Sequence, residues 1–303
     1  MTNIIFLGTS EFAVPILKKI VKSGIKVSMV FSQPPSKSKR GQNINKSPIH
    51  KISDELNLKI STPSKIIEEY ELIQSLNVDI AIVVAYGQII TEGLLNLSKF
   101  GFINVHSSLL PKYRGAAPIQ RCLINSEKYT GISIMKINNK LDSGPVCNKY
   151  KIEIKKNENF LSLSKRLSEL GAEKIIENIT NILQSKLEFI DQDHQSATYA
   201  KKILKSEGKI NWNFEASKIQ AIINGLYPSP GAWFEFNNER YKILKSKVLY
   251  IQGKPGMVID NQLVVGCGKN SLQIIELQRQ GKKPQMTNQF LLGSKIGKNS
   301  ILK

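Results

Sequence analysis

Short apolar runs of strand length alternate, over the first third of the chain, with segments whose apolar side chains recur at helical spacing. The runs are residues 3–7, 27–31, 79–85 and 102–105, and the helical segments are residues 11–21, 49–56 and 66–76. Strands and helices that alternate in this way build parallel sheets with helices on both faces. The sequence therefore predicts an α/β fold class, with a doubly wound, mostly parallel sheet in a Rossmann-like N-terminal domain.

The last third of the chain carries a different pattern. A long helix is predicted at residues 160–184, with its amphipathic pattern interrupted near Gly171, and a polar stretch and a second helix at 216–224 follow. Five short apolar runs bounded by turn residues come next, at residues 231–236, 241–250, 256–259, 262–265 and 272–277. Such spacing is typical of a small β-barrel, here expected to be OB-like.

The chain is long enough for two domains, since it has 303 residues and single domains most often have about 100–200. We predict an N-terminal domain at residues 1–189, a linker at 190–207 and the β-barrel domain at 208–303. Dinucleotide binding is disfavoured, because the turn after the first strand holds only Gly8 where a Gly-x-Gly-x-x-Gly fingerprint would be needed.

The net charge of +19 has two interpretations, a polyanionic partner or a Lys-rich genomic composition. Its distribution is uneven. Residues 201–303 hold 17 Lys and Arg against 6 Asp and Glu, while the first 200 residues hold 26 against 18. The predicted C-terminal domain is therefore the more cationic part of the chain, which favours a polyanionic partner for it.

Cysteine and histidine are few and scattered. The three cysteines form no Cys-x-x-Cys pair and none of the three histidines has a ligand at metal-site spacing, so we predict neither a disulfide framework nor a metal. No apolar run is long enough to span a bilayer, and no leader precedes the first predicted strand. We expect a soluble, cytoplasmic protein that does not associate with a membrane.

Asn104 and His106 stand two residues apart on the strand that opens the stretch Gly101–Gln120, and residues two apart on a strand share a face. A carboxamide can donate a hydrogen bond to a developing oxyanion, and an imidazole can pass a proton near neutral pH. The pair fits acyl or one-carbon transfer. Alone, an Asn-x-His pair is more often a hydrogen-bonding unit at the end of a strand.

Further residues resolve this ambiguity. After Asn-x-His the sequence continues with Ser-Leu-Leu-Pro and Arg-Gly-Ala-Ala-Pro-Ile, and a Leu-Asp-Ser-Gly loop follows at residues 141–144. Together with Phe-Leu-Gly-Thr near the start, Val-Ala-Tyr-Gly at 84–87 and the basic C-terminal part, these motifs make essentially the whole chain resemble the methionyl-tRNA formyltransferase family. The resemblance identifies 1–189 as the catalytic domain and 208–303 as the tRNA-binding domain.

The resemblance implies transfer of a formyl group from 10-formyltetrahydrofolate to the α-amino group of methionyl-initiator tRNA, for translation initiation. It implies three catalytic residues, Asn104, His106 and Asp142. In this scheme Asn104 donates to the oxyanion, His106 handles the proton lost by the amine, and Asp142 orients or polarises His106. No metal is expected to take part.

The same resemblance implies binding residues. The folate segment comprises Ser108, Leu109, Leu110 and Pro111, and Tyr86 and Gly87 form a wall of the pterin pocket. Arg40, in a basic loop at residues 32–47, is expected to contact the acceptor arm of the tRNA. The role of Arg114 stays open between a structural arginine and an RNA contact. Ser107 replaces the family's usual glycine after the histidine, without removing a catalytic group.

Two other functions remain possible on the sequence alone. Related formyltransferases with the same Asn-His-Asp site act on an amino-sugar nucleotide or on a purine precursor, and the basic loop and basic tail argue against these acceptors. A noncatalytic RNA-binding protein would not need Asn104, His106 and Asp142 together. We expect the protein to be a monomer.

Overall fold

A computed structural model describes residues 2–37 and 44–303. The chain folds into two compact units, each assembled from separate segments. Unit 1 comprises residues 1–115, 130–152 and 164–199, and unit 2 comprises residues 116–129, 153–163 and 200–303. Both units draw on the middle of the chain, so neither is one continuous stretch of sequence.

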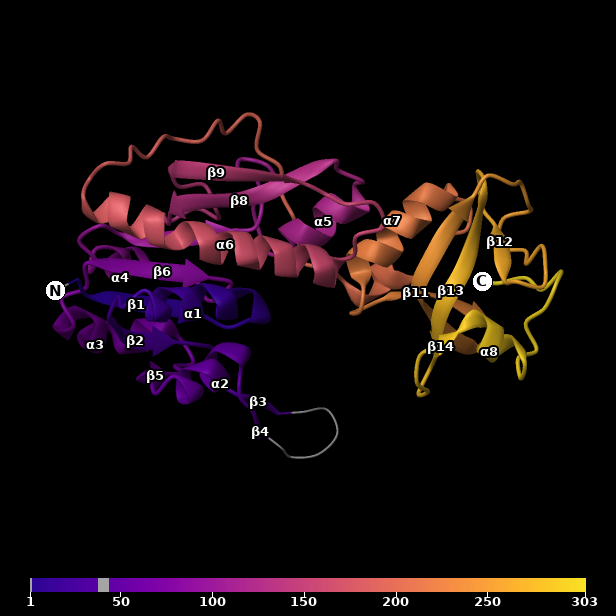
Figure 1. Ribbon diagram of the computed structural model, residues 1–303, viewed down its shortest axis with the longest axis horizontal. Helices are drawn as coiled ribbons and strands as arrows, with labels where there is room; N and C mark the ends of the chain where they lie inside the picture. The colour runs from indigo at the N-terminus through magenta and orange to yellow at the C-terminus, as the bar shows by residue number, and fades with distance from the viewer. Residues whose placement is uncertain (1, 38–43) are drawn as a thin grey trace. The chain divides into compact units, whose positions relative to one another are not determined.

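Unit 1 is built on a seven-stranded sheet with the strand order β5-β2-β1-β6-β7-β8-β9 (Figure 1). The strands are β1 Ile4–Gly8, β2 Val27–Phe31, β5 Ile60–Ser61, β6 Ile80–Val84, β7 Phe102–His106, β8 Tyr129–Lys136 and β9 Val146–Glu153. Neighbours from β5 to β7 pair in parallel, whereas β8 is antiparallel to β7. In a separate two-stranded sheet, β3 Ser36–Lys37 pairs antiparallel with β4 Ile44–Asn45.

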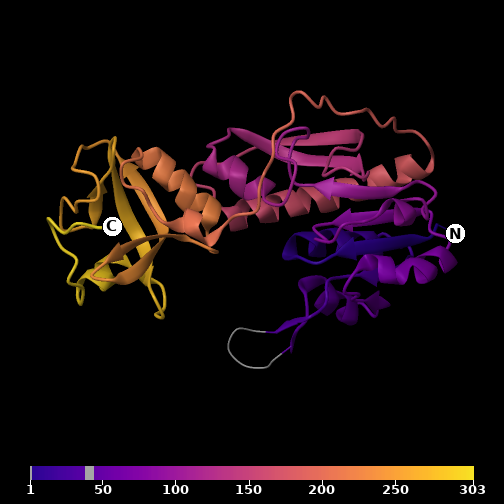
Figure 2. The ribbon, with the colours of Figure 1, turned by 180° about the vertical axis from the view of Figure 1, so that it is seen from behind.

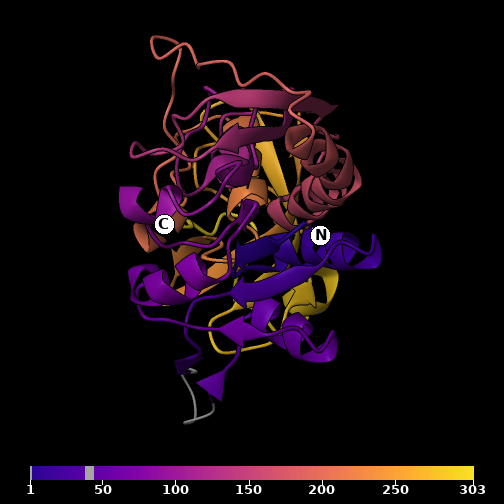
Figure 3. The ribbon, with the colours of Figure 1, turned by 90° about the vertical axis from the view of Figure 1, so that its left-hand side faces the viewer.

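Helices cover both faces of this sheet, as Figure 3 shows end-on. One face is covered by α1 (Val14–Lys22), α2 (Pro48–Glu55) and α6 (Phe160–Leu183), and the other by α3 (Tyr70–Ser75) and α4 (Glu92–Leu95). Short 3-10 turns at Glu11–Ala13 and Ile66–Glu69 lead into α1 and α3. Because β1 and β6 lie between two helical layers, every residue of both strands is buried.

The helix predicted at residues 160–184 is confirmed as α6, which runs from Phe160 to Leu183 without a break at Gly171, where its amphipathic pattern is interrupted. Gly171 serves packing instead. A Cβ atom built at this position would lie 2.9 Å from Ile16 Cδ1 of α1 and 3.4 Å from Val105 Cγ1 of β7. The glycine therefore allows α6 to approach β7, the strand that carries the Asn-x-His pair.

Unit 2 contains an antiparallel half-barrel, with the strand order β10-β11-β13-β12 and β14 added beside β13. Figures 1 and 2 show its strands in orange and yellow, with a helix along them. The elements are η3 Lys205–Gly208, α7 Ala216–Leu226, β10 Ala232–Phe236, β11 Glu239–Leu249, β12 Val264–Gly266, β13 Ser271–Arg279, β14 Gln285–Met286 and α8 Thr287–Leu291. The apolar run at 256–259 is not a strand but forms single bridges, such as Val258 with Val265.

A chain of aromatic rings fills the centre of unit 2. The rings of Trp212 and Phe234 lie 6.1 Å apart, Phe234 stacks on Tyr241 at 5.3 Å, and Tyr241 meets Phe290 edge-on at 5.7 Å. The short helix α5 (Pro118–Ile124) also belongs to this unit, where it packs against α7. Together the two units confirm the predicted fold class, a mostly parallel α/β sheet followed by a smaller β-rich domain.

Candidate active site

The predicted catalytic strand is β7, and it lies inside the sheet of unit 1. Asn104 pairs in register with Val83 of β6 on one side and with Met135 of β8 on the other, and His106 pairs with Ser133. The four other residues of β7 are buried, including His106 at 6% exposure, while Asn104 is half-buried. The Asn104 carboxamide makes no hydrogen bond to the residues that the structure describes, which leaves its N–H groups free to donate to a ligand.

The structure brings His106 and Asp142 together. His106 Nδ1 lies 3.8 Å from Asp142 Oδ2, and His106 Nε2 lies 3.0 Å from the carbonyl oxygen of Tyr113. Because a carbonyl can only accept, Nε2 must carry the proton of the neutral imidazole. The lone pair is then on Nδ1, the nitrogen that faces the carboxylate. A proton taken up at this position would meet the negative charge of Asp142.

The Asp142 carboxylate is fixed by a backbone group. Gly115 N donates to Asp142 Oδ2 at 2.7 Å, and the Asp142 side chain is 17% exposed. The backbone of Asp142 lies in the left-handed region, with φ at 44°, a conformation that non-glycine residues seldom adopt. The loop around Asp142 therefore depends on its surroundings to hold this conformation.

The predicted folate segment is a loop held by one hydroxyl group of β8. Ser133 Oγ donates to the carbonyl of Ser108 at 2.7 Å and accepts from Leu110 N at 3.0 Å. Ser108 Oγ donates to the Lys112 carbonyl at 2.6 Å. Leu110 is buried, whereas Leu109 and Pro111 are half-buried. Hydrogen bonds thus hold the loop at Ser108 and Leu110, while Leu109 and Pro111 stay partly exposed.

Tyr86 and Gly87 lie at the end of β6, next to the turn after β1. The Tyr86 carbonyl accepts from Thr9 Oγ1 at 2.8 Å and from Gln33 Nε2 at 3.0 Å. Its ring packs into the core beneath α3 and α4, where burial raises the pKa of the hydroxyl group. Gly87 has φ at 82°, and a Cβ atom there would lie 2.4 Å from Gln33 Nε2. The Tyr86 side chain is therefore part of the core, and its backbone is tied to Thr9 and Gln33.

Two arginines that the sequence singled out have different outcomes. Arg40 lies outside the described residues, so its predicted contact with tRNA stays a prediction. Arg114, whose role was left open, is 2% exposed and donates through Nε and Nη2 to Gln192 Oε1, at 3.1 and 2.8 Å. Gln192 was not among the residues predicted for the site. It lies in the polar stretch predicted to be a linker, where nothing in the local pattern marks it.

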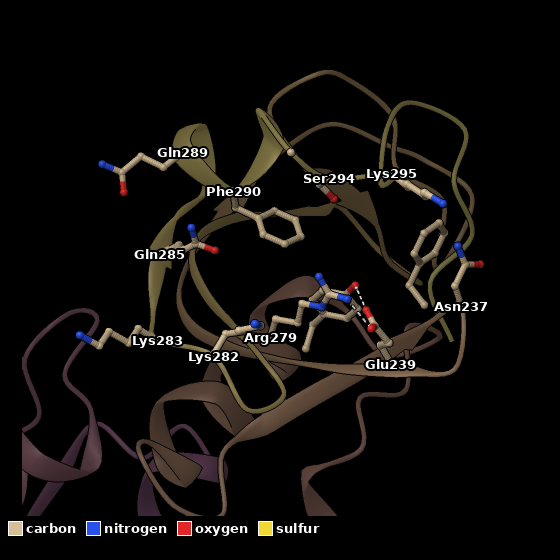
Figure 4. Close-up of a pocket in the computed structure, with 13 residues that line it drawn as sticks. Asn237, Glu239, Arg279, Lys282, Lys283, Gln285, Gln289, Phe290, Ser294 and Lys295 are labelled. Carbon is tan, nitrogen blue, oxygen red and sulfur yellow. Dashed lines mark hydrogen bonds and ion pairs between the residues drawn. The ribbon is translucent and has the colours of Figure 1, made fainter.

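A pocket of about 650 Å³ lies in unit 2, between the β10–β11 turn, the end of β13 and α8 (Figure 4). An ion pair between Arg279 and Glu239 forms one side of it, and the Tyr241 hydroxyl donates to Glu239 Oε2 at 2.8 Å. Hydrogen bonding to Arg279 lowers the pKa of Glu239, and burial raises the pKa of Tyr241 to about 12. Lys282 and Lys283 stand at the rim, both exposed.

The described part of the chain offers no cluster of metal ligands. Among residues 2–37 and 44–303, no group of three His, Cys, Asp or Glu side chains is placed to hold a metal ion. Within the same ranges no helix is both long and apolar enough to cross a membrane. None of the three cysteines is in a disulfide, and burial raises the pKa of Cys147 to about 11 and that of Cys267 to about 12.

Known proteins resemble the chain along its whole length. The family model described as Formyl transferase matches residues 2–179, and the one described as Formyl transferase, C-terminal domain, matches residues 202–295. A methionyl-tRNA formyltransferase of Pelagibacter ubique is 56% identical over 302 residues, 98% of this chain and 97% of that protein. One of Thermodesulfovibrio yellowstonii is 42% identical over 299 residues, 97% of each chain.

Solved structures agree on the fold. An N-formyltransferase of Helicobacter canadensis, in complex with folinic acid and dTDP-3-aminofucose, superposes with a TM-score of 0.70 over 92% of this chain and all of that one, at 22% identity. This likeness concerns the fold. The sequence matches reach further: with a family model over more than half of its length and close relatives along nearly all of it, this chain belongs to the methionyl-tRNA formyltransferase family.

Proposed function

We propose that this chain transfers the formyl group of 10-formyltetrahydrofolate to the α-amino group of methionine on initiator tRNA, and that Asn104, His106 and Asp142 carry the chemistry. The observation that supports this most directly is the approach of His106 Nδ1 to Asp142 Oδ2, at 3.8 Å, beside a half-buried Asn104 carboxamide on the same strand. His106 Nδ1 is the proton acceptor, and the Asp142 carboxylate supplies the negative charge that stabilises the bound proton. The Asn104 carboxamide is a hydrogen-bond donor without a partner among the described residues.

The reaction assigns one task to each group. The neutral amine, whose pKa is about 8 when unperturbed, attacks the formyl carbon and forms the new C–N bond. The carbonyl electron pair moves onto oxygen, where the Asn104 amide donates to it; one donor of this kind is typically worth about 3 kcal/mol of barrier. His106 Nδ1 takes the proton that the nitrogen loses, and the bond from carbon to tetrahydrofolate nitrogen then breaks as that nitrogen is protonated.

Asp142 acts through His106. A carboxylate that faces Nδ1 stabilises the imidazolium that forms when the proton arrives, and the bond from Gly115 N keeps that carboxylate from turning away. Asn104 and His106 need no large rearrangement to act, because both are fixed by the backbone ladder of β7. We infer that the site is largely formed before substrate arrives.

The folate would lie along the loop of Ser108 to Pro111 and the end of β6. In this proposal Leu109 and Pro111 contact the pterin, while Ser133 fixes the loop that carries them. The backbone at Tyr86 and Gly87 supplies the facing wall, and Thr9 and Gln33 hold it in place. No metal takes part in this scheme.

The tRNA would be bound mainly by the basic C-terminal region. Residues 201–303 hold 17 Lys and Arg against 6 Asp and Glu, and the pocket of unit 2 gathers Arg279, Lys282 and Lys283 at one place. Cations gathered in this way neutralise backbone phosphates and release counterions. We further propose that Arg40 contacts the acceptor arm and that the protein acts as a monomer in the cytoplasm.

Formylation of charged initiator tRNA by the purified protein tests the proposal. We expect formyl-methionyl-tRNA to form with 10-formyltetrahydrofolate as donor, and an amino-sugar nucleotide to be a poor acceptor at the same concentration. Asn104→Ala should lose most of this activity, whereas the matched control Asn125→Ala, on the short turn after α5, should keep it. Formylation of the sugar nucleotide alone would overturn the acceptor, and full activity in Asn104→Ala would overturn the mechanism.

A further inference from the structure

Arg114 is the charged residue of the Arg-Gly-Ala-Ala-Pro-Ile motif, and its position calls for an explanation. The side chain is 2% exposed and forms no ion pair with any carboxylate of the described residues. It donates instead to two neutral partners, Gln192 Oε1 and, through Nη2 at 3.0 Å, His194 Nδ1. Burying a cation without a counterion costs free energy. The hydrogen bonds of Arg114 therefore have a task other than neutralising its charge.

Gln192 uses its full hydrogen-bonding capacity in this network. Its Oε1 accepts both bonds from Arg114, and its Nε2 donates to the carbonyls of Asp142 at 2.9 Å and Gly144 at 2.7 Å. The orientation of the carboxamide is unambiguous, because arginine only donates and backbone carbonyls only accept. Gln192 is also 7% exposed. One buried amide thus connects Arg114 to both sides of the Asp142 loop.

The loop that Gln192 holds is one that needs support. Asp142 has a left-handed backbone, and Gly144 packs so closely that a Cβ atom there would lie 1.9 Å from the carbonyl oxygen of Lys136. Arg114 constrains the other side as well. Its own N donates to the Thr198 carbonyl at 2.9 Å, and the next residue, Gly115, donates to the Asp142 carboxylate. Arg114 is therefore connected to Asp142 in two ways. Its side chain holds Gln192, which binds the Asp142 carbonyl, and the residue after it, Gly115, binds the Asp142 carboxylate.

We propose that Arg114 and Gln192 are positioning residues, which hold the backbone of the Asp142 loop so that its carboxylate faces His106. The inference rests on the proposed function and extends it. Neither side chain is asked to touch a substrate. Arg114 locks the Gln192 carboxamide by two donated bonds, and the carboxamide fixes the carbonyls of Asp142 and Gly144. In this proposal Arg114 is a structural arginine that supports the Asp142 loop, and it does not contact RNA.

Gln192→Glu keeps the hydrogen bonds from Arg114 and removes the two that Gln192 donates to the Asp142 loop. The new carboxylate still accepts from Arg114, yet it replaces the Nε2 donor by an oxygen that faces two carbonyls. We expect kcat for formylation to fall about 10- to 100-fold, because misplacement of a catalytic group by about 1 Å has that effect. KM for the tRNA should stay unchanged. Gln195→Glu, an exposed change in the same segment, is the matched control and should leave kcat unchanged.

A double-mutant cycle decides whether the effect passes through Asp142. If Gln192 acts only by holding that residue, Gln192→Glu should cause no further loss in an Asp142→Ala background, measured in single turnovers. An equal further loss, or a change confined to KM for the tRNA, would overturn the inference. Should Gln192→Glu not fold, as judged by its melting temperature, Gln192→Met tests the same point without a buried charge.

Failure of this inference is distinguishable from failure of the proposed function. If wild-type protein formylates an amino-sugar nucleotide and not methionyl-tRNA, the proposed acceptor is wrong, and the same cycle is measured on that amine. If wild-type protein formylates methionyl-tRNA and Gln192→Glu is equally active, the proposed function stands and only the positioning role falls.

Discussion

Two polar regions of the molecule are built in opposite ways. Around Asp142, the polar groups are buried and engaged: Arg114 is 2% and Gln192 7% exposed, and every hydrogen-bonding position of the Gln192 carboxamide is used. In the pocket of unit 2 the side chains of Arg279 and Glu239 are 45% and 42% exposed, and the lysines at its rim are exposed. The first region restricts motion, and the second leaves charge accessible.

The difference follows from what each region has to recognise. A group that must meet a transition state has to be held within a fraction of an ångström, and burial with full hydrogen bonding achieves this. A polyanion is recognised through charge, which acts over about 8–10 Å at ordinary salt and tolerates flexible side chains. We therefore expect single changes to act steeply in the first region and gradually in the second.

The largest effects are expected from the three groups of the active site. Asn104→Ala, His106→Ala and Asp142→Ala should each lower the rate of formyl transfer about 100-fold or more, because each acts on the transition state. Affinity for tRNA should change little, measured by filter binding of the same variants. Combined variants should lose less than the product of the single losses, as for groups that act as a unit. A variant that loses tRNA affinity and rate in parallel would contradict this assignment.

The next effect concerns the exposed cations. Lys282→Glu together with Lys283→Glu should weaken tRNA binding, and the slope of log K against log salt should fall by about 1 for each phosphate that is no longer neutralised. The formylation rate at saturating tRNA should stay near that of the wild type. Lys247→Glu, a charge reversal in unit 2 but outside the pocket, serves as the control. If the double variant and Lys247→Glu lose the same tRNA affinity per reversed charge, then net charge, and not this pocket, determines tRNA binding.

A substitution at Gly144 tests how tightly the conformation of the Asp142 loop is held, without changing any charged group. Gly144→Ala would place a methyl group 1.9 Å from the carbonyl of Lys136, so the loop or β8 must shift. We expect a loss of about 1–3 kcal/mol in the free energy of unfolding, as is typical of overpacking, together with a reduced formylation rate. Denaturant unfolding and single-turnover assays measure the two quantities. A stable, active variant would show that this loop is more adaptable than the hydrogen bonds suggest.

The smallest effect belongs to an ion pair within unit 2. Arg121 Nη2 donates to Glu207 Oε1 at 3.0 Å, and this bond lowers the pKa of Glu207. A lowered pKa in the folded state means that the stabilisation is present above the ordinary Glu value and is lost as pH falls through the folded pKa. Glu207→Gln should therefore cost less than about 1 kcal/mol at pH 7, and this cost should shrink as pH falls through the folded pKa of Glu207. A cost that persists in acid would have another origin.

Much of the fold could be predicted because strand and helix periods are local properties. The strands β2 and β6 lie where the apolar runs at 27–31 and 79–85 placed them. Periodicity does not predict contacts between segments that are distant in the sequence. The amphipathic pattern is interrupted near Gly171, but the pattern does not show that this glycine permits close packing against Ile16 and Val105. The same limit applies to α5, which packs against a helix almost a hundred residues later.

In the candidate site, too, local motifs could be predicted from the sequence and long-range contacts could not. Asn104, His106 and Asp142 could be singled out because their motifs are short and specific, and the structure brings His106 and Asp142 within 3.8 Å. Their roles stay predictions until the variants are measured. Gln192 could not be found, because a glutamine in a polar stretch carries no signal of burial. Its partner Arg114 was visible in the sequence, but only the fold shows what its guanidinium contacts.

The composition of unit 2 bears on how the protein is made. This unit needs residues 116–129, 153–163 and 200–303 together, so a ribosome that has released only the first two segments has exposed α5 before its partner α7 exists. Buried side chains of α5, such as Ile119 and Leu123, then wait uncovered while some ninety further residues are synthesised, at about 5–20 residues per second. For those seconds the nascent chain presents an apolar helix that a chaperone could cover.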